Sequence, residues 1–101
     1  MIIPKGCTVE NTFSIPFEAN EIATLYVTYS QNEEVVIEKE LEDCVIENKE
    51  LKVYLSQEDT LKFDSNIKIE IQVRLRLLSG EAKKSHIITT KTDRILKDEV
   101  I

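Results

Sequence analysis

The clearest pattern in the chain is a strict alternation of apolar and polar residues between Ile67 and Ser79. The apolar members share one parity: Ile67, Ile69, Ile71, Val73, Leu75 and Leu77. The polar members occupy the other parity: Lys68, Glu70, Gln72, Arg74 and Arg76. Successive side chains of a β-strand point to opposite faces, whereas a helix would spread these apolar residues around its circumference. The pattern therefore predicts one long strand with a buried face and a solvated face.

Shorter runs of strand-forming residues precede this segment. They cover residues 8–15, 24–30, 35–42, 43–47 and 51–55. In the first run Asn11 interrupts the apolar parity, and Pro16 ends the strand or confines it to a sheet edge. Residues 17–21 are predicted to form a loop, and Asn48-Lys49 a turn.

The register of the hairpin after Ser30 follows from its loop. A three-residue loop, residues 32–34, sets Tyr29 opposite Ile37 and Leu25 opposite Leu41. A two-residue loop would set Val27 opposite Glu38. The three-residue loop is favoured because register follows the buried face.

One helical turn is predicted at residues 56–61. Ser56 can cap its first turn, and Asp59 stands three residues later, as in a capping box with Asp in place of Glu. Leu61 and Phe63 would then plug this turn into the core. Such a turn commonly crosses from one sheet of a sandwich to the other.

The strand that returns after the hairpin at Ser79-Gly80, residues 82–91, has no single predicted register, because Ile87 and Ile88 are adjacent. A two-residue loop sets Ile71 opposite Ile88 and Val73 opposite His86, and a three-residue loop sets Val73 opposite Ile87. Residues 93–96 are expected to form a brief last strand or turn, in which Ile95 or Leu96 closes the core.

Together these elements predict an all-β fold, an immunoglobulin-like antiparallel β-sandwich of about seven strands in one domain, residues 1–101. The Cys–Trp–Cys signature of antibody domains is absent, since the chain has no Trp. With only two Gly and two Pro, it has few of the residues that a sharply bent barrel needs.

Charge narrows the classes of partner. The 101 residues carry a formal net charge of -6, which argues against nucleic acid and against anionic membrane as partners. The two cysteines, Cys7 and Cys44, do not imply a disulfide or a zinc site. No signal-peptide pattern follows the start, so we expect the cytoplasm, or an exit other than secretion.

Residues suited to catalysis are sparse. The only histidine is His86, and no nucleophile-elbow, phosphate-loop or metal-protease motif accompanies it. Glu38, Glu40 and Glu42 share one strand face at spacings of ~7 Å, which is typical of a solvated face. If the two strands share a sheet, these acids lie beside Arg74 and Arg76. The sequence predicts no enzyme, no cofactor and no metal site.

Contact residues are better candidates. Tyr26 and Tyr54 occupy the wet parity of their strands, and an exposed tyrosine is a common interface anchor. The candidate interface residues are Tyr26, Tyr54, Arg74 and Arg76. The free edges of a sandwich offer a second route to docking or assembly.

The whole chain also resembles small tail-region proteins of Firmicutes phages and prophages. The matching segments are Ile3-Pro4-Lys5-Gly6-Cys7-Thr8, Phe13-Ile15-Pro16-Phe17, residues 25–31, residues 55–63 and Ile95-Leu96-Lys97-Asp98. These proteins are similar in strand order to the N-terminal immunoglobulin-like domain of phage baseplate upper proteins. The resemblance implies a virion or tail-assembly component whose partners are other tail or baseplate proteins, or copies of itself. A carbohydrate or cell-surface recognition module is the alternative, and it would need aromatic side chains clustered on one surface.

Overall fold

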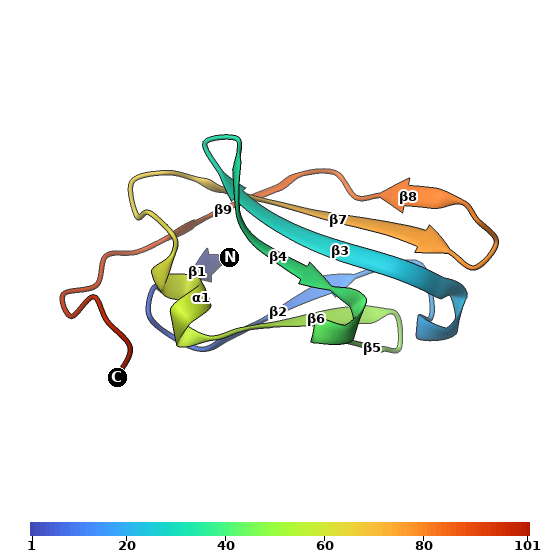
Figure 1. Ribbon diagram of the computed structural model, residues 1–101, viewed down its shortest axis with the longest axis horizontal. Coiled ribbons are helices and arrows are strands. Elements are labelled where there is room, and N and C mark those ends of the chain that lie inside the picture. Colours follow the sequence, from blue (N-terminus) through green and yellow to red (C-terminus); the bar gives the residue numbers. More distant parts are fainter.

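The chain folds into two β-sheets packed face to face, as a computed structural model of all 101 residues describes (Figure 1). The larger sheet contains β1 (Ile2–Ile3), β9 (Ile88–Thr92), β7 (Ile69–Leu77), β3 (Ile22–Gln31) and β4 (Glu34–Glu40), with β8 (Ala82–Lys84) also paired to β7. The smaller sheet contains β2 (Val9–Ser14), β6 (Glu50–Leu55) and β5 (Cys44–Glu47). Sixteen buried apolar residues, contributed by both sheets, form the hydrophobic core.

The strand order is that of an immunoglobulin-like sandwich. The smaller sheet, β2-β6-β5, has the order B-E-D, and the run β9-β7-β3-β4 has the order G-F-C-C′ of variable-type domains. The predicted fold class, an all-β sandwich, is thus confirmed, with nine strands where about seven were predicted. One pairing departs from the predicted antiparallel arrangement, because β1 pairs with β9 in parallel.

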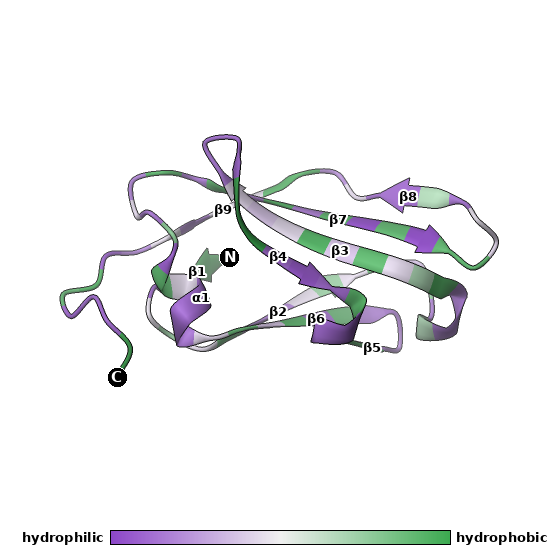
Figure 2. Cartoon of the chain, in the orientation of Figure 1, coloured by the Kyte–Doolittle hydropathy of each residue, from purple (hydrophilic) through white to green (hydrophobic).

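The alternating segment forms β7, and its faces are as predicted. Ile69, Ile71, Val73 and Leu75 are buried, whereas Arg74 and Arg76 are exposed. Figure 2 shows the alternation as bands of hydrophobic and hydrophilic colour along β7 and β3. The strand is shorter at both ends than the pattern suggested, and Ile67 and Lys68 precede it.

The β3–β4 hairpin reaches the predicted register by another route. Tyr29 does lie opposite Ile37, but the loop has two residues, Asn32 and Glu33, both with positive φ. A register shift after Tyr29 then inserts one extra residue on β4 and restores the buried parity. The predicted three-residue loop is wrong. Leu41 is also not paired with Leu25, because the ladder ends at Glu40 and Leu41 begins the 3-10 turn η2 (Leu41–Asp43).

The helical turn is α1 (Gln57–Leu61), and it connects the two sheets between β6 and β7. The Asp59 N–H donates to Ser56 Oγ at 3.1 Å, and the Ser56 N–H donates to Asp59 Oδ2 at 2.9 Å, so the capping box is confirmed. Phe63 is buried as expected, but Leu61 is only half-buried. Thr60 is the fully buried residue of this turn, and its hydroxyl donates to the Cys7 carbonyl at 2.9 Å.

The return strand is broken in two, so neither single register holds. Leu77 pairs with Glu81 around a three-residue loop, and β8 then sets Arg74 opposite Lys84. In β9 the register has moved by one residue, and Ile71 lies opposite Ile88, the pairing predicted for a two-residue loop. Ser85 bridges the break, since its Oγ accepts the Val73 N–H at 3.1 Å.

Three shorter segments complete the chain. The 3-10 turn η1 (Ala19–Glu21) lies in the loop predicted for residues 17–21. The strand β1 had no counterpart in the sequence analysis, although Ile3 is fully buried there. Residues 93–96 form no strand, Leu96 is exposed, and Ile95 packs over Gly6 and beside Leu61.

Candidate functional site

The outer face of the larger sheet carries a row of four side chains, one from each of four adjacent strands. Strand pairing sets Glu40 of β4 beside Tyr26 of β3, Tyr26 beside Arg74 of β7, and Arg74 beside Lys84 of β8. All four residues are exposed, and Tyr26 retains 42% of its surface. One row therefore reads acid, aromatic, base, base across the sheet. We call the outer face around this row the Tyr26 face.

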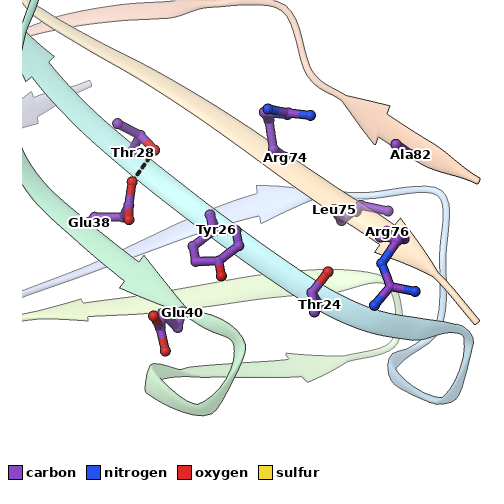
Figure 3. Close-up of a pocket in the computed structure, with 9 residues that line it drawn as sticks. All are labelled: Thr24, Tyr26, Thr28, Glu38, Glu40, Arg74, Leu75, Arg76 and Ala82. Carbon is purple, nitrogen blue, oxygen red and sulfur yellow. Dashed lines mark hydrogen bonds between the residues drawn. The ribbon is translucent and has the colours of Figure 1, made fainter.

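The acidic side of the Tyr26 face is crowded with like charges. Glu38 and Glu40 project from β4, and Glu42 and Asp43 follow in η2. The pKa of Glu40 is raised above its ordinary value. The larger cause is a side-chain hydrogen bond with Glu42, and the next is the negative charge of Glu42. Glu38 has one polar partner on this face, the Thr28 hydroxyl, which donates to it at 3.3 Å (Figure 3).

The basic side consists of Arg74, Arg76 and Lys84. None of the three lies within 4.0 Å of a carboxylate in this chain, so they form no intramolecular ion pair. Glu38, Glu40 and Glu42 were predicted to lie beside Arg74 and Arg76 if their strands shared a sheet. The sheet is shared, but β3 lies between β4 and β7 and separates the two charges by two strand spacings, ~10 Å.

Between the two charged sides the surface is shallow and hydroxyl-rich. Thr24, Tyr26 and Thr28 of β3 line a depression of about 590 Å³ whose margins are Glu38 and Glu40 on one side and Arg74 and Arg76 on the other (Figure 3). Its chemistry suits a surface that docks against another charged surface.

The four candidate interface residues are not brought together. Tyr26, Arg74 and Arg76 share the Tyr26 face, whereas Tyr54 is exposed on β6 of the smaller sheet. The third tyrosine, Tyr29, is fully buried. Sequence reasoning found three members of the face from parity alone, but it missed Lys84.

Comparison with protein-family models, with curated proteins and with solved structures finds no match. The residues of the chain itself must therefore carry any functional argument.

A second concave surface lies between β2 and β8. Phe13, Ile15, Phe17, Val73, Leu75 and Ile88 line a groove of about 560 Å³ together with Lys83, Lys84 and His86. Sequence reasoning missed it because it depends on two edge strands of different sheets lying close together. Lys83 lies opposite the buried Leu75, so a charge occupies an inward position of the edge strand β8. Such a charge disfavours the addition of another strand.

The remaining candidates for chemistry are isolated. His86 lies beside this groove, and no three His, Cys, Asp or Glu side chains are grouped closely enough to hold a metal ion. Both cysteines are free, and burial raises the pKa of the Cys44 thiol to about 11, which makes its thiolate scarce at neutral pH. No helix has the length and apolar character needed to span a membrane.

Proposed function

We propose that this chain is a non-enzymatic structural module of a phage or prophage tail, and that it acts through protein–protein contacts made by the Tyr26 face. The observation that carries the proposal is the exposed row of Glu40, Tyr26 and Arg74, in which an aromatic side chain separates unpaired charges of opposite sign. Tyr and Arg are the residue types that most often anchor protein interfaces. The resemblance to tail-region proteins gives the proposal its biological setting.

The carbohydrate-recognition alternative is less well supported. It needs several exposed aromatic side chains on one surface, to stack against sugar rings. Tyr26 and Tyr54 lie on the outer faces of different sheets, and Tyr29 is buried. A single tyrosine on each face favours the protein-contact proposal.

Binding to neighbouring gene products tests the proposal. The purified chain would be immobilised and presented with each virion structural protein encoded beside its gene, with binding followed by biolayer interferometry. We expect one of them to bind, and we expect Tyr26→Ala and Arg74→Glu to weaken that binding at least tenfold. Tyr54→Ala, which removes a still more exposed tyrosine from the other sheet, should leave binding unchanged.

Two results would overturn the proposal. One is the absence of binding both to every structural protein encoded nearby and to the chain itself. The other is an equal loss of binding in the Tyr26→Ala and Tyr54→Ala variants, which would remove the Tyr26 face from the explanation.

A further inference from the structure

We infer that the Tyr26 face binds a second copy of this chain, related to the first by a two-fold axis that runs along β3 through Tyr26. The inference rests on the proposed function, because it names a partner for the same face. It arises from the arrangement of charge: the acids lie on one side of β3, the bases lie on the other, and Glu38, Glu40, Arg74 and Arg76 form no ion pair within their own chain.

The two-fold axis follows from this arrangement. The axis lies in the plane between the two copies, parallel to β3. Rotation by 180° about it turns the face over and exchanges the sides occupied by β4 and β7. Glu40 of each copy then lies against Arg74 of the other, and the two Tyr26 side chains meet at the axis. A two-fold interface uses the same patch on both copies, so the patch must complement itself, and this one does.

The other in-plane axis is disfavoured by the same charges. A two-fold axis perpendicular to β3 would keep β4 over β4 and β7 over β7. It would set the acids Glu38 and Glu40 against their own copies, and likewise Arg74 and Arg76. Like charges placed against one another oppose association, so the charge pattern selects the axis along β3.

The size of the face sets the expected strength. The 29 residues of β4, β3, β7 and β8, at ~3.4 Å per residue and ~4.8 Å between strands, give a patch on the order of 470 Å² per copy. That is below the ~800 Å² per partner of a standard stable interface. The separation of acids from bases is also incomplete, because β7 carries an acid, Glu70, opposite Ser30. We therefore expect a weak dimer that dissociates as salt is added.

Charge reversal on each side of the face tests the inference. One variant combines Arg74→Glu with Arg76→Glu, and a second combines Glu38→Lys with Glu40→Lys. Sedimentation velocity over a concentration series at low salt should show dimers for the natural chain and a shift to monomer for each variant alone. An equimolar mixture of the two variants should regain the dimer, because a mainly acidic face then meets a mainly basic one.

A matched control separates this effect from net charge. Lys52→Glu with Lys62→Glu also lowers the net charge by 4, from -6 to -10, but alters exposed or half-exposed residues outside the Tyr26 face. We expect this variant to dimerise as the natural chain does. If it loses the dimer to the same extent as the Arg74→Glu/Arg76→Glu variant, the Tyr26 face is not the interface.

Cross-linking tests the axis itself, because a residue on a two-fold axis meets its own copy. In a Cys7→Ser background, Thr24→Cys, which lies on the same face of β3 and leaves Tyr26 in place, should give covalent dimers in high yield with a short bis-maleimide. Tyr54→Cys should give few. Equal yields would overturn the axis. A natural chain that stays monomeric at every concentration, or a variant mixture that regains no dimer, would overturn the inference. Binding of a tail protein through the Tyr26 face would still support the proposed function in that case.

Discussion

The buried hydroxyl of Tyr29 donates a 2.8 Å hydrogen bond to Asn11 Oδ1 and so joins the two sheets through the core. Tyr29 is 0% exposed on β3, and Asn11 is 5% exposed on β2. Asn11 is the residue that interrupts the apolar parity of its strand. Its partner explains the interruption, because a buried amide and a buried hydroxyl satisfy each other there. Burial raises the pKa of Tyr29, so the hydroxyl remains a donor.

Removing the Tyr29 hydroxyl should therefore destabilise the fold. We expect Tyr29→Phe to lower the free energy of unfolding by about 1–3 kcal/mol, because the Asn11 oxygen is left buried without its donor. Adding Asn11→Leu should recover part of that loss, since both polar groups are then gone. Urea unfolding measures each step, and Tyr54→Phe is the control at an exposed hydroxyl. Equal effects of Tyr29→Phe and Tyr54→Phe would contradict the stabilising role of this hydrogen bond.

The two faces of β7 predict opposite outcomes at adjacent positions. Val73 is 4% exposed, so Val73→Asp places an unpaired charge in the core and should unfold the domain. Arg74 is exposed and makes no ion pair within its chain, so Arg74→Ser should cost less than about 1 kcal/mol of stability. Circular dichroism with thermal unfolding measures both, and comparable destabilisation by the two substitutions would be inconsistent with the strand's orientation.

The sequence predicted which face of a strand is buried more reliably than it predicted how strands pair with one another. Parity alone predicted the buried face of β7 and the exposure of Tyr26, Arg74 and Arg76. The two-residue strand β1 is too short to show a period, and adjacent Ile87 and Ile88 fit either face of the return strand. The Tyr26 row depends on β4, β3, β7 and β8 aligning across long stretches of sequence. No local pattern encodes that alignment.

Lys39 and Asp59 join β4 to α1 through a 2.9 Å ion pair, and this pair predicts a loss of stability in acid. Burial acts to raise the pKa of Asp59, but hydrogen bonds from the Ser56 N–H and the Lys39 ammonium hold it below its ordinary value of 3.8. A carboxylate with a lowered folded pKa stabilises the fold above its unfolded pKa. That contribution is lost as pH falls through the folded pKa.

Urea unfolding between about pH 6 and pH 2.5 should therefore show a fall in stability that Asp59→Asn partly removes. At neutral pH the same substitution should cost about 0.5–1.5 kcal/mol, because it removes the ion pair and weakens the capping box. Glu58→Gln alters an exposed acid in the same turn and should change neither quantity. A pH profile of Asp59→Asn that matches the natural chain would exclude this ion pair as a source of the acid sensitivity.

Two hairpins in this fold turn through residues that are poorly suited to their backbone. Glu33 has φ of 66° and Lys49 has φ of 62°, each directly after an Asn that also has positive φ. Two-residue hairpin loops of this kind favour Asn-Gly, because glycine adopts positive φ without strain.

Glu33→Gly and Lys49→Gly should each raise the free energy of unfolding by about 0.5 kcal/mol, after the greater chain entropy of unfolded glycine is subtracted. The corresponding rise in Tm is about 2–4 °C by calorimetry. The adjacent substitutions Glu34→Gly and Glu50→Gly fall on the first residue of a strand and should lower Tm instead, because glycine loses more conformational freedom on folding than glutamate. If all four substitutions stabilise the protein, relief of backbone strain at Glu33 and Lys49 does not explain the gain.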